Sequence, residues 1–86
     1  MMYSIRITSA SDAHTYRFSA RASLFGGRAV QKEYWGAVDV LGRGMDYVFP
    51  DFHRVASRDV RSIELLGDGE VVQRGVFEPM RLPEEL

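Results

Sequence analysis

Tyr3-Ser-Ile-Arg-Ile-Thr8, near the start of the 86-residue chain, alternates strictly between large apolar and polar side chains. A period of two places the apolar side chains on one face of an extended segment and the polar side chains on the other. This is the pattern of a strand that has one face in a core and one face in water. The segment therefore predicts a fold built on an antiparallel sheet.

The same alternation returns after a short polar segment. Small and turn-forming residues occupy Ser9-Ala-Ser-Asp-Ala13, and Thr15-Tyr-Arg-Phe-Ser-Ala-Arg21 then alternates again. The two alternating segments are predicted to pair as a hairpin. Because cross-strand neighbours on one face lie close together, we expect the outward face to group three basic side chains. These are Arg6, Arg17 and Arg21.

The middle of the chain is predicted with less regular structure. Residues 22–33 are compatible with a loop or one short helix, because Gly26-Gly27 would weaken a helix running through them by about 1 kcal/mol each. From Tyr34 to Leu41 the period of two returns and predicts a strand. Gly42-Arg-Gly44 supplies a turn, and Met45-Asp-Tyr-Val-Phe49 is predicted as the returning strand of a second hairpin.

The second half of the chain contains a third predicted hairpin. Pro50 cannot donate a ladder hydrogen bond and should stop the preceding strand, which Phe52-His-Arg-Val55 briefly resumes. After a turn at Ser57-Arg-Asp59, two strands are predicted around Gly67-Asp-Gly69. They span residues 60–66 and 70–77. Residues 1–78 are thus predicted as one β-rich domain, and residues 79–86 as an extended tail.

Five or six short strands with tight turns predict a mainly β fold, a small antiparallel barrel or sandwich. The segment from Tyr47 to Leu66 resembles the closing strands of small SH3-like or Sm-like barrels, where a strand breaks at a short turn and continues on the other sheet. This resemblance covers about a quarter of the chain and rests on its pattern of strands and turns. It implies a barrel architecture and no particular activity.

Composition restricts the chemistry open to the chain. The absence of cysteine excludes disulfides, thiol nucleophiles and thiolate metal sites. The chain has no signal-peptide pattern and no apolar run near the ~18 residues of a membrane span, so we expect a cytoplasmic protein without membrane contact. Arginine supplies ten of the eleven basic side chains, and it is the residue suited to paired contacts with carboxylates or phosphates.

Candidate catalytic groups are few. His14 and His53 are the only histidines, and the period-two offset of Asp51 and His53 allows both to share one strand face, with His14 or Asp12 as a third metal ligand. A small metal-binding or hydrolytic enzyme around His53 and Asp51 is therefore one alternative. No nucleophile motif accompanies these residues, so we expect a protein that is not an enzyme and has no metal or cofactor.

The basic side chains support a second alternative. Arg28 follows the permissive pair Gly26-Gly27 and extends the basic group formed by Arg6, Arg17 and Arg21. Such a face could grip phosphates, with Tyr34 or Trp35 as stacking surfaces for bases. The hypothesis is a small-barrel nucleic-acid-binding protein, although the net charge of −1 argues against strong nonspecific binding.

Aromatic side chains support the leading hypothesis. A thin β-domain with ten aromatic residues is expected to leave some exposed, and exposed rings near arginine are frequent interface anchors. The candidate partner-binding residues are Trp35, Tyr47, Phe52 and Arg54. We therefore expect a non-enzymatic protein-binding module or inhibitor, with a second copy of the chain as a candidate partner. In this profile the chain resembles small phage-encoded inhibitors of host defence systems such as anti-CRISPR proteins.

Overall fold

The computed structural model describes residues 2–24 and 27–77. The predicted tail at residues 79–86 lies outside the described residues, as do residues 25–26 within the segment predicted as loop or short helix. The elements along the described chain are β1 (Tyr3–Ser9), β2 (Ala13–Arg17), α1 (Ala20–Leu24), α2 (Gly27–Gly42), β3 (Tyr47–Val48), β4 (Arg54–Val55), the 3-10 helix η1 (Ser57–Asp59), β5 (Val60–Gly67) and β6 (Glu70–Val76).

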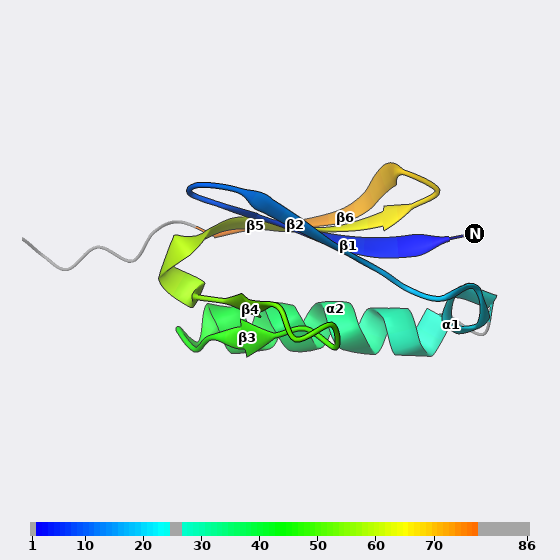
Figure 1. Ribbon diagram of the computed structural model, residues 1–86, viewed down its shortest axis with the longest axis horizontal. Coiled ribbons are helices and arrows are strands. Elements are labelled where there is room, and N and C mark those ends of the chain that lie inside the picture. Colours follow the sequence, from blue (N-terminus) through cyan, green and yellow to red (C-terminus); the bar gives the residue numbers. More distant parts are fainter. Residues whose placement is uncertain (1, 25–26, 78–86) are drawn as a thin grey trace, which may run out of the picture.

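These elements form two layers. One layer is an antiparallel four-stranded sheet in the order β2-β1-β5-β6, and the other holds α2 and the small β3–β4 hairpin beside it (Figure 1). The fold is mainly β, as predicted. The sheet is open, and it does not close into the expected barrel. Since α2 covers its apolar face, the sheet has no need to curl on itself or to pack against a second large sheet.

Helix α2 corrects the strand predicted between Tyr34 and Leu41. The residues that α2 buries are Val30, Tyr34, Ala37 and Leu41. Their spacings of four, three and four residues follow one face of a helix with 3.6 residues per turn. The apparent period of two in this segment was a coincidence. The predicted single short helix within residues 22–33 is likewise replaced by α1 and the much longer α2.

The glycines at residues 42–44 end this helix and do not form a hairpin turn. Gly44 has a φ of 79°, its N–H donates to the carbonyl of Leu41, and the N–H of Met45 donates to the carbonyl of Val40. This is the Schellman arrangement, in which a left-handed residue after the helix satisfies its last carbonyls. The predicted hairpin between residues 34–41 and 45–49 is therefore wrong. Strand β3 pairs instead with β4, on the other side of Pro50.

The outer hairpins agree more closely with the predictions. Strands β1 and β2 pair antiparallel, but β2 ends at Arg17, and the Ser19 hydroxyl accepts the Ala22 N–H at the start of α1. Strands β5 and β6 pair across Asp68-Gly69, whose φ values of 52° and 85° suit a two-residue turn of type I′. The predicted strands at 60–66 and 70–77 are confirmed within one residue.

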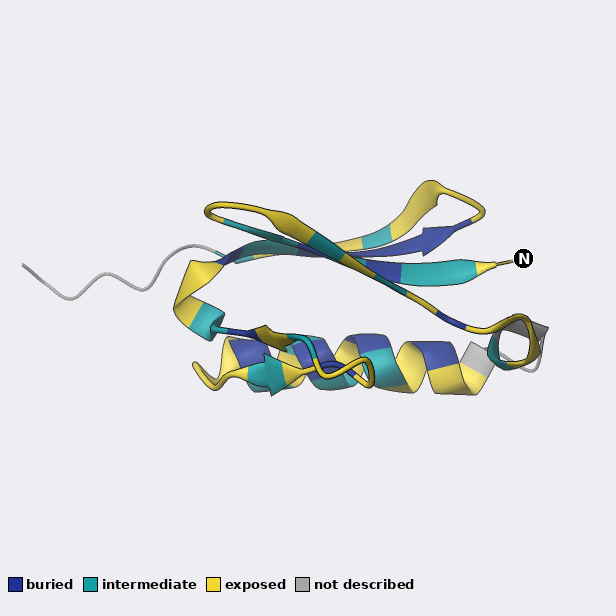
Figure 2. Ribbon diagram, in the orientation of Figure 1, coloured by how far each residue is buried: buried dark blue, intermediate teal, exposed yellow. Residues whose placement is uncertain are grey.

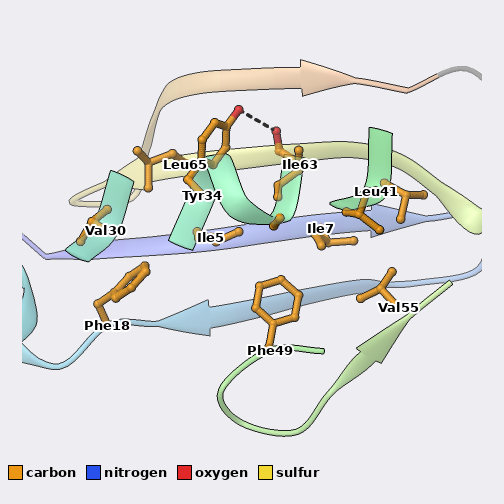
Figure 3. Close-up of a cluster of buried hydrophobic side chains, with 12 residues drawn as sticks. Ile5, Ile7, Phe18, Val30, Tyr34, Leu41, Phe49, Val55, Ile63 and Leu65 are labelled. Atoms are coloured by element: carbon orange, nitrogen blue, oxygen red, sulfur yellow. Dashed lines mark hydrogen bonds between the residues drawn. The ribbon is translucent and has the colours of Figure 1, made fainter. Parts of the chain in front are cut away.

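The core lies between the sheet and the layer of α2 (Figure 3). Its central side chains come from β1, β5 and α2, and the hydroxyl of Tyr34 donates to the carbonyl of Ile63 at 3.4 Å. Phe49 and Val55 add the β3–β4 hairpin to this core. Because Ile5 and Ile7 face the core, Ser4 and Arg6 lie on the opposite, uncovered face of the sheet. No helix among the described residues is both long and apolar enough to cross a membrane.

Candidate functional site

The β3–β4 hairpin turns through a three-residue loop. The N–H of Phe49 donates to the carbonyl of His53 at 2.9 Å, and the N–H of Phe52 donates to the carbonyl of Phe49 at 2.8 Å. Pro50 and Asp51 therefore occupy the centre of the turn, where the fixed φ of proline is favourable. Phe52 follows in the left-handed region, with a φ of 68°. This arrangement is a turn followed by a bulge, in which the left-handed position is usually glycine.

Phe52 is an unusual occupant of that position. A left-handed backbone at a bulky residue costs about 1 kcal/mol or more, because Cβ crowds the neighbouring backbone. Burial of the ring does not offset this cost, since Phe52 is 88% exposed. The loop that joins β3 to β4 is coloured as exposed at its tip in Figure 2. Both the backbone conformation of Phe52 and the exposure of its ring are therefore energetically unfavourable. Such local outliers concentrate at functional sites.

The turn is held in place by a cluster of polar side chains. One carboxylate oxygen of Asp51 accepts the N–H of His53 at 3.2 Å, and the other lies 2.8 Å from Nε2 of His14 on β2. The rings of His14 and His53 stack, with centroids 3.7 Å apart and an interplanar angle of 9°. We call His14, Asp51 and His53 the turn brace. It ties the exposed turn to the edge of the main sheet.

The environment of Asp51 favours its charged form. Burial by itself raises the pKa of Asp51. The hydrogen bonds from the His53 N–H and the His14 ring, together with the charges of the two histidines, lower this pKa by more than burial raises it. The net pKa of Asp51 therefore lies below its ordinary value. A charged Asp51 is the form that holds the turn brace together.

The turn brace is also the group proposed from the sequence as a metal or hydrolytic centre. His14, Asp51 and His53 do come together, but they lie at the surface, with Asp51 exposed and both histidines partly exposed. In residues 2–24 and 27–77, no three His, Cys, Asp or Glu side chains are placed to hold a metal ion, so Asp12 does not complete such a site. The convergence is thus explained by support of the turn.

The other predicted partner-binding residues divide between the β3–β4 hairpin and helix α2. Arg54 is exposed on β4, and Tyr47 on β3 is half-buried, with its ring packed edge-on against Phe49 at 5.1 Å. Together with Phe52, they belong to one hairpin. Trp35 is 53% exposed on α2, where its indole N–H donates to Gln31 at 2.9 Å. The predicted aromatic surface is therefore centred on the hairpin, and Trp35 is a separate exposed ring on the helix.

The predicted basic face is smaller than expected. Arg6 and Arg17 lie on the uncovered face of the sheet, as their strand positions required. Arg21 and Arg28 do not join them, because Arg21 belongs to α1 and Arg28 to α2. Strand β2 was predicted to continue to Arg21 but ends at Arg17, and the loop or short helix predicted at residues 22–33 is replaced by α1 and the longer α2.

Sequence reasoning did not anticipate the ion-pair cluster formed by Arg6, Glu64 and Arg74. Oε1 of Glu64 accepts from Arg6 at 2.7 and 2.8 Å, while Oε2 accepts from Arg74 at 2.7 and 3.0 Å. Glu64 is only 2% exposed, because its partners cover it on an otherwise open face. Burial raises the pKa of Glu64, but the two arginines outweigh burial and hold it below its ordinary value. The sequence does place opposite charges on these strands, at Arg6, Glu64 and Arg74. Their contact could not be predicted, because it depends on which strands are neighbours and on the register between them.

The described residues thus offer two features with chemistry: the braced turn that exposes Phe52 and the arginines of the uncovered sheet face. They lie on different layers of the molecule. The hairpin is beside α2 (Figure 1), whereas the arginines belong to the face of the sheet opposite the buried Ile5 and Ile7. Comparisons with protein-family models, with curated proteins and with solved structures find no match for this chain.

Proposed function

We propose that the protein is a non-enzymatic protein-binding module whose contact surface is the β3–β4 turn, with Phe52 as the anchor. One observation carries this proposal: Phe52 is 88% exposed at a φ of 68°, where glycine would be less strained. A large aromatic side chain that adds nothing to the core and strains the backbone has no stabilising role to explain it. Burial in a pocket of a partner supplies the missing explanation.

The construction of the turn supports a binding role. Proline at the centre of the turn, two backbone hydrogen bonds and the turn brace all restrict the loop before any partner arrives. A preorganised loop loses less conformational entropy on binding, so more of the contact energy appears as affinity. Arg54, exposed on the same hairpin, adds a residue type that is enriched at protein interfaces.

The nucleic-acid alternative receives less support from the geometry. Tyr34, a suggested stacking surface, is 1% exposed, and Trp35 lies on α2, the layer opposite the uncovered face with Arg6 and Arg17. The arginines and the rings therefore do not form one surface. An inhibitor, including one of the phage-encoded anti-defence class, would use the Phe52 turn to occupy a site on its target protein.

The test compares three forms of the protein as affinity baits. Wild type, Phe52→Ala and the control Val48→Ala, which changes an exposed residue of the same hairpin, are each immobilised and exposed to lysate of the native host. We expect a protein retained by wild type and by Val48→Ala but lost with Phe52→Ala. Titration calorimetry with that purified protein should then show at least a tenfold weaker affinity for Phe52→Ala, equivalent to about 1.4 kcal/mol.

Two outcomes would contradict this function. Equal retention of every captured protein by wild type and Phe52→Ala would show that the ring is not an anchor. Loss of a wild-type homodimer in Phe52→Ala, measured by light scattering, would replace the foreign partner with a second copy of this chain. Substitution of Trp35 with Ala, in a parallel bait, measures whether the helix contributes to the same surface.

A further inference from the structure

We propose that the uncovered face of the sheet holds a binding site for a phosphomonoester on a small molecule. A depression of about 510 Å³ opens on this face, within the size range of small-molecule sites. Its polar lining comes from the β1–β2 pair and the β5–β6 turn, as Ser4, Arg6, Thr15, Arg17 and Asp68. This site does not depend on the Phe52 turn, which belongs to another layer of the molecule.

Arg6 is held in a fixed orientation at this site. Its Nε and Nη2 both bind Oε1 of Glu64, at 2.8 and 2.7 Å, and Glu64 is fixed from the other side by Arg74. Three strands, β1, β5 and β6, thus contribute to placing one guanidinium group. The remaining N–H groups of Arg6 stay available to a ligand, since a guanidinium carries five donors. Fixing a donor in advance reduces the entropy lost on binding an anion.

Arg17 supplies the second guanidinium group. In the β1–β2 register Arg17 is opposite Ser4, and Thr15 is opposite Arg6, so the two arginines are diagonal neighbours on one face. Diagonal neighbours on a sheet are within reach of each other's long side chains. No ion pair of Arg17 occurs among the described residues. The hydroxyls of Ser4 and Thr15 complete a set of donors between the two guanidinium groups.

This set of donors fits a phosphate better than a carboxylate. A phosphomonoester has three terminal oxygens and about two negative charges to distribute over two guanidinium groups and two hydroxyls, whereas a carboxylate has two oxygens and one charge. Asp68 also lines the depression, and its Oδ1 accepts the backbone N–H of Met2 at 2.8 Å. Its single negative charge is outnumbered by the positive charges of Arg6 and Arg17. Leu66 lines the same depression and gives an apolar contact for the organic part of the ligand.

Titration of the 15N-labelled protein with phenyl phosphate, followed by NMR, tests the site. We expect the largest shifts at the backbone amides of residues 4–6 and 15–17, with tighter binding than for inorganic phosphate or benzoate. Arg17→Ala should weaken phenyl phosphate binding about tenfold, since it removes a charge-assisted contact. Arg28→Ala removes an exposed arginine from α2 and should leave the affinity unchanged. Thr15→Val keeps the branched shape and should weaken binding a few-fold.

Other results would overturn the proposal. Equal affinity for benzoate would show a general anion surface, and equal weakening by Arg28→Ala and Arg17→Ala would show nonspecific charge attraction. Absence of shifts at residues 4–6 and 15–17 at high phenyl phosphate concentration would exclude the site altogether. Phe52→Ala should bind phenyl phosphate as wild type does, so failure of the protein-binding function leaves this result intact.

Discussion

Phe49 and Phe52 are three residues apart in the same turn and have opposite environments. Phe49 is 1% exposed and contacts rings on three sides, with centroid distances of 5.1 Å to Tyr47, 5.7 Å to His14 and 5.9 Å to Tyr16. Phe52 is 88% exposed in a left-handed backbone. The first ring attaches the hairpin to the core, while the second makes no such contribution.

The contrast separates residues that stabilise the fold from residues that require another explanation. Hydrophobic burial of Phe49 accounts for its presence, as it does for Val55 on the returning strand. At Phe52 the left-handed backbone and the exposure of the ring to water both cost free energy. The turn brace maintains this conformation. Strain that neighbouring contacts maintain is a better indicator of function than exposure alone.

The largest effect is expected for Phe49→Ala. Removing a buried phenylalanine loses its transfer free energy and leaves a cavity, so the free energy of unfolding should fall by about 3–5 kcal/mol. Chemical denaturation followed by circular dichroism measures this change, and Phe49→Leu serves as the milder variant if Phe49→Ala does not fold. A loss below about 1 kcal/mol would show that the hairpin is not attached through this ring.

A smaller loss is expected for Asp51→Ala. The substitution removes the acceptor of the His53 N–H and the partner of His14, which should lower the free energy of unfolding by about 1–2 kcal/mol. The order of the turn should also decrease, measured as faster amide exchange at Phe52 and His53. Unchanged exchange at both amides would mean that the backbone hydrogen bonds alone hold the turn.

Phe52→Gly is expected to stabilise the domain. Glycine adopts the left-handed region without strain, and this gain should exceed its larger entropy loss on folding, for a net increase of about 0.5–1 kcal/mol. Phe52→Ala keeps the strain, so its stability should match that of wild type in the same denaturation experiment. If Phe52→Ala loses more than about 1 kcal/mol, the ring contributes to folding and its contrast with Phe49 disappears.

The smallest effect is expected from acid, because Asp51 is exposed and its interactions are screened by water. Since the pKa of Asp51 is lower folded than unfolded, its contribution is present above the unfolded value of about 3.9 and is lost as pH falls through the lower folded value. Thermal unfolding from pH 6 to pH 2 should show a smaller decline for Asp51→Asn than for wild type. If the unfolding temperatures of wild type and Asp51→Asn decline equally with pH, Asp51 does not contribute to the loss of stability in acid.

Prediction from sequence succeeded where a local pattern had one interpretation. The alternation at residues 3–8 and the Asp68-Gly69 turn each specify a local conformation, and both are present as predicted. Between Tyr34 and Leu41 the same reasoning failed, because those residues fit both a strand and the face of a helix. At the candidate site, the sequence predicted Phe52 and Arg54 as interface residues but gave no sign of the left-handed backbone.

Sequence by itself determined the alternating strand at residues 3–8, the Asp68-Gly69 turn and the opposite faces of Ile5 and Arg6, since each depends on residues a few positions apart. Tertiary structure alone decided the open sheet covered by α2, the enclosure of Glu64 by two arginines, and the union of His14 with Asp51 and His53. The side-chain contacts of Glu64 and His14 among these features join residues between 10 and 58 positions apart. Their pairing depends on strand register and layer packing, which no local pattern contains.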